Sequence, residues 1–242
     1  MLDLHCHILP QLDDGATSLR EALAMARFCV QDGITYVVAT PHCNQFTRLM
    51  RPDILPRVAH LNEELVRADL PLTILPGSEI QVSDTATYRS EFEAGLYCHL
   101  GDGGSFSLLE FSWKGELYPE DAPQLISWLR GKGTTPIIAH PERQRFFEEK
   151  PKRLPELVEA GAWLQLTVDS LLGNHGPAAQ LSGERMLRSH SPVVLSTDAH
   201  NLQRCSGLSA GYVWVKERLG PKRADQLRVH ADLVLSALLG SV

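Results

Sequence analysis

Short apolar strand-like runs alternate with longer helical patterns along almost the whole chain, and this alternation restricts the fold more than any other feature. The strand-like runs end at turn residues, and the longer stretches repeat apolar residues at helical spacing. The pattern predicts strands at 2–7, 34–40, 72–75, 106–111, 136–140, 163–168 and 192–197. It predicts helices at 18–33, 52–70, 122–133, 154–161, 178–190, 208–220 and 224–240. Such alternation is typical of a parallel sheet covered by helices.

Seven strand–helix units fit a closed or nearly closed β/α barrel better than an open sheet. A chain of 242 residues is long enough to give such a barrel a substantial core. Without a linker or a low-complexity block, we expect one domain over residues 1–242. The GDGGS stretch at 101–105 is predicted to be a loop. Residues 41–53 and 173–183 are predicted to form longer loops over the face of the barrel at the carboxyl ends of its strands, where β/α barrels carry their active sites.

Composition excludes several classes of protein. The formal net charge is −6 and no basic tract is present, so nucleic acid is not expected as a partner, because phosphate backbones require clustered Lys and Arg. No apolar run reaches the length of a transmembrane helix. Five cysteines without a CxxC pair argue against a disulfide framework and a zinc ribbon. With no secretory leader at the start, the chain is expected to be cytoplasmic.

The first predicted strand contains two histidines one residue apart. Alternate side chains of a strand point to the same face, so His5 and His7 are expected to share a face, and Cys6 points the other way. Asp13 and Asp14 follow within a few residues. Two imidazoles on one face, with carboxylates just beyond, make half of a metal site.

Residues that bind metals also follow most of the other predicted strands. In a β/α barrel, the active site is built where the strands end, on their carboxyl side. Histidine, aspartate or glutamate reaches this rim from at least six strands, which is more than chance placement would produce. The candidate ligands are His5, His7, Asp14, His42, Glu79, Glu110, His140, Asp198 and His200.

The types of ligand define the metals that fit. Imidazole and carboxylate suit Mn, Fe or Zn, and the missing cysteine pair disfavours a structural zinc. Nine ligands are too many for one ion; with one bridging carboxylate they fit three, leaving open positions for water and substrate. Such a site generates hydroxide and clamps a phosphate ester for in-line attack.

Between residues 2 and 201, the chain resembles the polymerase and histidinol phosphatase (PHP) family. The motifs that carry the resemblance are HCHILPxxDDGA, TPHCN, GSEI, LLEF, HPER and STDAHN. Within it, they are similar to the bacterial manganese-dependent tyrosine phosphatases of capsular and exopolysaccharide loci. The resemblance implies a distorted seven-stranded (β/α) barrel with a metal site at the C-terminal ends of its strands. It also implies three divalent ions, with Mn²⁺ favoured over Fe or Zn.

The resemblance also assigns ligands. One ion would be held by His5, His7, Glu79 and Asp198; a second by Glu79, Glu110 and His140; a third by Asp14, His42 and His200. Asp14 is preferred to Asp13 because the family places an acid directly before a glycine, as in Asp14-Gly15. Arg143 matches the arginine that holds the substrate phosphate, and guanidinium geometry suits that role.

The reaction implied is hydrolysis of phosphotyrosine on protein, with the tail of an autophosphorylating bacterial tyrosine kinase as the partner. Arg143 would neutralise the phosphate, and His140 and Asp198 are candidates for moving protons, although metal ligands are poor free acids. The family often carries an arginine shortly after the DAHN motif, and Arg204 lies near that position. The loops at 43–53, 101–105 and 169–183 are expected to determine substrate choice.

Other functions remain open from the sequence. A PHP phosphatase for a small phosphomonoester, such as histidinol phosphate, is the main alternative, followed by a PHP nuclease and by a regulatory protein with an inactive metal site. A cysteine-dependent tyrosine phosphatase is excluded, because that class requires arginine at the sixth position after its cysteine. Here those positions are Leu12, Thr35, Leu49, Gly104 and Gly211.

Overall fold

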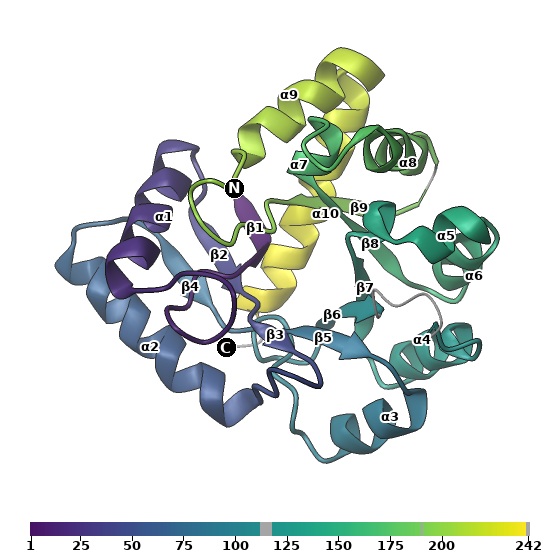
Figure 1. Cartoon of the computed structure of the whole chain (residues 1–242), viewed down its shortest axis with the longest axis horizontal. Coiled ribbons are helices and arrows are strands. Elements are labelled where there is room, and N and C mark those ends of the chain that lie inside the picture. Colours follow the sequence, from purple (N-terminus) through teal and green to yellow (C-terminus); the bar gives the residue numbers. More distant parts are fainter. Residues whose placement is uncertain (112–117, 190, 241–242) are drawn as a thin grey trace.

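The computed structural model describes residues 1–111, 118–189 and 191–240 (Figure 1). Its strands are β1 (Leu2–Cys6), β2 (Tyr36–Ala39), β3 (His42–Cys43), β4 (Thr73–Leu75), β5 (Glu79–Val82), β6 (Phe106–Phe111), β7 (Thr135–Ala139), β8 (Trp163–Thr167) and β9 (Val193–Ser196). Its α-helices are α1 (Leu19–Gln31), α2 (Arg51–Arg67), α3 (Thr85–Glu93), α4 (Ala122–Gly131), α5 (Arg145–Glu149), α6 (Arg153–Glu159), α7 (Val168–Leu171), α8 (Pro177–Arg188), α9 (Leu208–Leu219) and α10 (Pro221–Leu239). A short 3₁₀ helix, η2, covers Pro141–Arg143.

The strands form two parallel sheets, with the orders β1-β2-β4 and β3-β5-β6-β7-β8-β9. Figure 1 shows them around a common centre, with most of the helices outside. The predicted α/β class with parallel strands is therefore confirmed. The described residues contain nine strand segments where seven were predicted, because short breaks separate β2 from β3 and β4 from β5.

The two sheets meet at both of their sides. β3 follows β2 after Thr40 and Pro41, and β5 follows β4 after three residues. On the other side, the backbone of β1 pairs with the segment after β9: the Asp198 amide donates to the His5 carbonyl at 2.9 Å, and the His7 amide donates to the Ala199 carbonyl at 2.8 Å. Strand ends from both sheets therefore face the same central region.

An irregular register in β1 brings the two histidines to the inner side. Pairing advances three residues in β1, from Asp3 to Cys6, against two in β2, from Val37 to Ala39. One extra residue in a strand shifts which side chains face inward. Leu2, Leu4, His5 and His7 are all turned to the inner side. Leu2 and Leu4 belong to a buried apolar cluster, and the His5 and His7 rings contact each other nearer the C-terminal end of the strand.

The centre of the molecule has an apolar end closed by the C-terminal helix. Residues of six strands and the α10 residues Val234 and Leu238 form one buried cluster. In the view of Figure 1, α10 crosses the central region enclosed by the strands. The main strand residues of this buried cluster are Leu2, Leu4, Val38, Leu75, Phe106, Leu108, Ile137 and Val194. A larger apolar cluster lies between the strands and the outer helices.

Several local predictions were wrong. Most of the loop predicted at 173–183 is helix α8, which agrees instead with the helix predicted at 178–190. The loop predicted at 41–53 contains β3 and the start of α2. Helix α3 was missed because its sequence, TATYRSEFE, buries only Thr85 and Tyr88. Strand β5 was missed because Pro76 and Gly77 precede it as turn residues. Gly77 lies where a Cβ would be 2.7 Å from Val38, so the break permits a close backbone approach.

Candidate metal centre

The predicted ligands converge from both sheets. His42 (β3) and Glu79 (β5) are register partners on neighbouring strands. Glu110 comes from β6, His140 follows β7, and the remaining candidates lie on β1, just after it, or in the turn after β9. Most of these side chains are buried in spite of their polarity, which is costly unless they are paired or bind a metal. The buried ones are His5, His7, Glu79, Glu110, His140, Asp198 and His200.

Four of these side chains present donor atoms at the spacing of a tetrahedral metal site. His5 Nε2 lies 3.3 Å from both His7 Nε2 and Asp198 Oδ1, and 3.5 Å from Glu79 Oε2. His7 Nε2 lies 3.5 Å from Asp198 Oδ1 and 3.6 Å from Glu79 Oε2. Donors about 2.1 Å from a central ion in a tetrahedron are about 3.4 Å apart. These five distances therefore match those between donors around one divalent ion.

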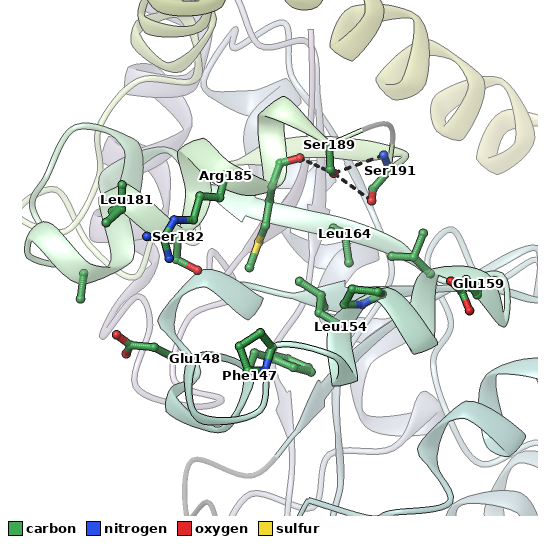
Figure 2. A pocket seen from close by; sticks show the side chains of 15 residues that line it. Phe147, Glu148, Leu154, Glu159, Leu164, Leu181, Ser182, Arg185, Ser189 and Ser191 are labelled. Carbon is green, nitrogen blue, oxygen red and sulfur yellow. Dashed lines mark hydrogen bonds between the residues drawn. The ribbon is translucent and has the colours of Figure 1, made fainter.

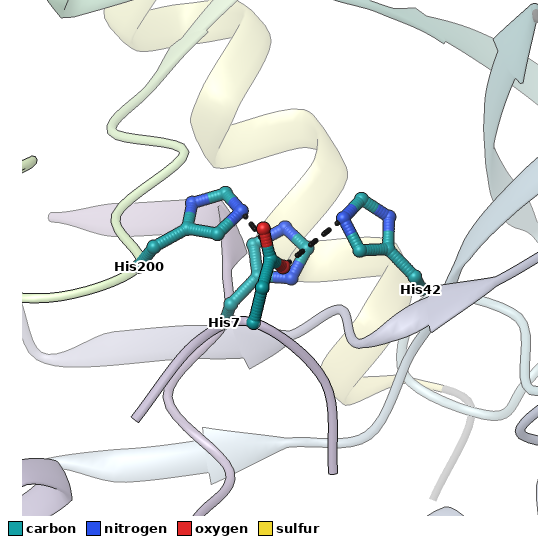
Figure 3. Close-up of side chains that lie close together, drawn as sticks. His7, His42 and His200 are labelled. Carbon is teal, nitrogen blue, oxygen red and sulfur yellow. Dashed lines mark ion pairs between the residues drawn. The ribbon is translucent and has the colours of Figure 1, made fainter. Parts of the chain in front are cut away.

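A second group lies beside the first and is the more exposed of the two. Asp14 Oδ1 lies 3.4 Å from His42 Nε2 and 3.4 Å from His200 Nε2. Figure 3 shows the rings of His7, His42 and His200 converging, and the His7 and His200 rings stack with their centroids 3.9 Å apart. The Asp14 side chain is 61% exposed, so this side of the centre is open to solvent.

A third group surrounds Glu79. His140 Nε2 lies 2.7 Å from Glu79 Oε1 and 3.7 Å from Glu110 Oε1. The other Glu79 oxygen, Oε2, lies 2.8 Å from His42 Nδ1 and faces His5 and His7. Glu79 directs Oε1 at His140 and Oε2 at His42, His5 and His7, so it has the placement of a bridging carboxylate.

Three of the histidines are fixed through Nδ1, which leaves Nε2 directed at the centre. His5 Nδ1 contacts Gln165 Oε1 at 3.0 Å, His7 Nδ1 contacts Asp13 Oδ2 at 2.7 Å, and His200 Nδ1 contacts the Asp198 carbonyl at 2.9 Å. A neutral imidazole that donates from Nδ1 has a free lone pair on Nε2, as metal ligands require. These contacts set the tautomers that metal binding needs.

Two candidate ligands have unusual backbone conformations. His140 has φ of 33° and Asp198 has φ of 52°, in the left-handed region that residues other than glycine seldom adopt. The amides around them are held by hydrogen bonds: His140 N–H donates to Gln165 Oε1 at 3.0 Å, and Asp198 N–H donates to the His5 carbonyl. Such strain persists where the surroundings enforce it, commonly at functional sites.

The centre is strongly charged without metal. Burial opposes ionisation of Asp198 and Glu79, but His5 and its neighbours hold both pKa values well below their usual range. Burial would lower the pKa of His5, but the carboxylates of Glu79 and Asp198 raise it to about 9. Burial acts the same way on His42, yet Asp14 and Glu79 raise its pKa to about 11. Protons on these imidazoles balance the buried carboxylates.

These pKa values predict that metal binding displaces protons. His5 and His42 have raised pKa values, so they are protonated at neutral pH without metal and must lose their protons to coordinate. We expect Mn²⁺ affinity to rise from pH 6.5 to 8.5, about tenfold per pH unit for each proton displaced. Calorimetric titrations in two buffers of different ionisation enthalpy measure this release; a pH-independent affinity would contradict it.

Arg143 lies at the edge of this centre, on η2 immediately after His140. Its Nη1 donates to Asp198 Oδ2, and its side chain is 18% exposed. The neighbouring Glu142 is buried, and its Oε1 accepts from the Thr167 amide at 3.0 Å. Arg143 thus presents a guanidinium beside the candidate ligands from a turn fixed by Glu142. Arg204 is exposed, on the turn after His200.

Two residues that sequence reasoning left without this role support the ligands. Asp13 binds the His7 ring and accepts from the amides of Gly15 and His42, each at 3.0 Å. Gln165 holds both the His5 ring and the His140 amide and has no exposed surface. A glutamine within the apolar strand WLQLT is the signal that was available, since a buried amide needs partners.

Replacing Gln165 by methionine is expected to weaken Mn²⁺ binding about 10–100-fold, as supporting contacts to ligands do elsewhere. The methionine removes the acceptor for His5 Nδ1–H, so the ring loses its tautomer and orientation. Gln165→Glu keeps an acceptor oxygen and should retain more of the affinity. Equal affinities for Gln165→Met and the unaltered chain would refute the positioning role.

Comparisons with known proteins identify the family of the chain. The family described as "Capsular polysaccharide synthesis, CpsB/CapC" matches residues 1–235. The chain belongs to this family. Among CpsB/CapC relatives, the tyrosine-protein phosphatase YwqE of Bacillus subtilis is 35% identical over 237 residues, covering 97% of this chain and 91% of YwqE. The tyrosine-protein phosphatase CpsB of Streptococcus pneumoniae is 26% identical over 236 residues, covering 95% of each chain.

A solved CpsB/CapC structure extends the similarity to the fold. A crystal structure described with those of YwqE from Bacillus subtilis and CpsB from Streptococcus pneumoniae superposes with a TM-score of 0.91 at 33% identity, covering 98% of this chain and 94% of the other. The two proteins are described as "unique metal-dependent tyrosine phosphatases". The resemblance inferred from the motifs is therefore confirmed at the level of the family.

Proposed function

We propose that the chain is a metal-dependent protein tyrosine phosphatase that does not use a cysteine nucleophile. The observation that carries this proposal is the set of four donor atoms of His5, His7, Glu79 and Asp198, spaced for a divalent ion, with Arg143 beside it. The names of the CpsB/CapC relatives support the same activity. Burial raises the pKa of Cys6 and that of Cys43, which disfavours a thiolate nucleophile at these positions near the centre.

We infer that the two sheets form one distorted seven-stranded (β/α) barrel, in a single domain over residues 1–242. In this interpretation, β2 with β3 and β4 with β5 are each one interrupted strand. The backbone contacts between β1 and the segment after β9 close the barrel. The candidate ligands then lie at the C-terminal ends of the strands, where β/α barrels carry their active sites.

Three divalent ions fit the ligand groups, and Mn²⁺ suits their nitrogen and oxygen donors, with Fe or Zn as alternatives. His5, His7, Glu79 and Asp198 would hold one ion; Glu79, Glu110 and His140 a second; Asp14, His42 and His200 a third. Among the described residues, the potential metal-binding groups keep Asp14, His42 and His200 together with His7, and keep Asp198 together with His5 and His7. They place Glu79 with His5 and His140, and Glu110 with His42 and Glu79. Bound divalent ions supply activated water and neutralise phosphate charge.

The residues of the chain supply orientation and charge. Arg143 donates to the phosphate oxygens through a planar fork that suits their geometry. Asp198, which accepts from Arg143, holds that guanidinium toward the centre. We propose His140 and Asp198 as the candidates for moving protons. Gln165 and Asp13 keep the imidazoles in the tautomer that binds metal.

The proposed substrate is phosphotyrosine on the tail of a bacterial tyrosine kinase of capsule or exopolysaccharide synthesis. The description of the family supports the capsule assignment. Within the described part of the chain, no helix has both the length and the apolar character needed to cross a membrane. The five free cysteines suit a reducing compartment, and we propose that the enzyme acts in the cytoplasm.

The direct test compares phosphate release from a phosphotyrosine peptide and from histidinol phosphate, each with Mn²⁺ and with a chelator. We expect chelator-sensitive release from the peptide and little from histidinol phosphate. Preference for histidinol phosphate would keep the metal chemistry and overturn the substrate. No release from either substrate with Mn²⁺, Fe²⁺ or Zn²⁺ would overturn the proposed function.

A further inference from the structure

A largely apolar cavity of about 450 Å³ lies between α8 and the pair α5 and α6, outside the candidate metal centre (Figure 2). This volume is within the usual range of ligand sites. The charged residues at this cavity, Glu148, Glu159 and Arg185, are exposed. Its apolar lining includes Phe147, Leu154, Val158, Leu164, Leu181 and Met186.

A second cavity, of about 410 Å³, adjoins this apolar cavity on the side of Arg143. Arg143, Glu142 and His175 line the second cavity. Glu148, Ala178 and Ser182 line both cavities, so the two adjoin. A chain whose phosphate binds Arg143 therefore has a path along α8 to the apolar cavity.

The walls of this path are joined to the turn that carries Arg143. Helix α8 packs against η2 and α7. Gly183 of α8 allows this approach: a Cβ there would lie 3.1 Å from Leu171 and 3.8 Å from the Glu142 side chain. The apolar cavity and the candidate phosphate-binding arginine are thus held by one packed unit.

The geometry points to a substrate subsite: the apolar cavity receives an apolar side chain of the protein substrate, a few residues from its phosphotyrosine. This inference rests on the proposed function, because it takes Arg143 as the site of the phosphate. The apolar cavity adjoins the second cavity, which Arg143 lines, and this favours a segment of the substrate chain as its occupant. The apolar lining favours an aliphatic or aromatic side chain of that segment. Peptide recognition commonly combines one anchoring group with pockets for neighbouring side chains.

The test is a set of phosphotyrosine peptides in a Gly/Ser/Asp background, with a single leucine moved through the four positions on each side of the phosphotyrosine. Steady-state kinetics with Mn²⁺ are measured for the unaltered chain, Leu181→Ser and Pro155→Trp, with free phosphotyrosine as the small substrate. Pro155 is exposed on α6 and lines the apolar cavity but not the cavity of Arg143. Leu181 is 50% exposed, so its replacement should not disturb folding. Leu233→Ser on α10, where the leucine is 55% exposed, is the matched control.

We expect leucine at one or two positions to lower KM about tenfold, as burial of part of a leucine side chain would. Leu181→Ser and Pro155→Trp should remove this preference, Leu233→Ser should keep it, and kinetics on free phosphotyrosine should be the same in all variants. A flat response to leucine, or a preference that survives both variants, overturns the subsite. A change in molecular mass of Leu181→Ser by light scattering assigns the cavity to a second copy and also overturns it. Activity on no substrate at all overturns the proposed function instead.

Discussion

Replacing Glu79 by glutamine is expected to lower Mn²⁺-dependent phosphotyrosine hydrolysis by about 10³-fold or more, because metal-assisted stabilisation contributes several kcal/mol. Glu79 is buried, and its two oxygens face four imidazoles. Oε1 faces His140, and Oε2 faces His42, His5 and His7. A neutral amide removes the bridging negative charge while keeping the size of the side chain.

The measurement pairs kcat/KM with the metal content of the purified variant by mass spectrometry. We expect Glu79→Gln to bind less metal per chain and to keep the far-ultraviolet circular dichroism of the unaltered protein. Glu217→Gln, an exposed position on α9, is the matched control for the same chemical change. Full activity and metal content in Glu79→Gln would rule out its bridging role.

Replacing Arg143 by lysine is expected to reduce kcat/KM by about 10²–10³-fold, comparable to the loss of one strong charge-stabilising donor. Lysine keeps the positive charge and loses the planar fork that binds two phosphate oxygens. Since Arg143 also donates to Asp198, the assay must be made at saturating Mn²⁺, where metal content stays at the level of the unaltered chain.

Arg188→Lys is the appropriate control for this substitution. Arg188 lies on α8 and forms an exposed ion pair with Glu184, so this change should leave kcat/KM within about twofold. If Arg143→Lys retained full kcat/KM, or if its loss followed metal content alone, Arg143 would not be the phosphate-binding group.

The sequence could predict which candidate ligands lie at the carboxyl ends of strands. In a parallel sheet, the carboxyl ends of all strands meet at one edge, so Glu110 at the end of β6 and His140 after β7 had to approach each other. The strand predicted at 106–111 coincides with β6. A continuous apolar run bounded by turn residues identifies a buried strand without any knowledge of its partners.

Other features depend on contacts that a linear pattern does not contain. The extra residue in β1, which turns both Leu4 and His5 inward, is set by pairing with β2. Strand β5 follows turn residues that indicated a loop, and its ladder with β6 overrides them. The separate tasks of Asp13 and Asp14 arise from three-dimensional neighbours: Asp13 faces His7, and Asp14 faces His42 and His200.

The closure of the apolar end by α10 divides the interior into two regions with different tolerance to change. The Val234 and Leu238 side chains pack with strand leucines and valines, whereas the ligands occupy the other end. Volume-conserving substitutions in an apolar cluster usually cost less than about 1.5 kcal/mol. Thermostability can therefore be engineered from the α10 end, for example by repacking around Leu238, while the end with the candidate metal ligands keeps its strained and charged arrangement.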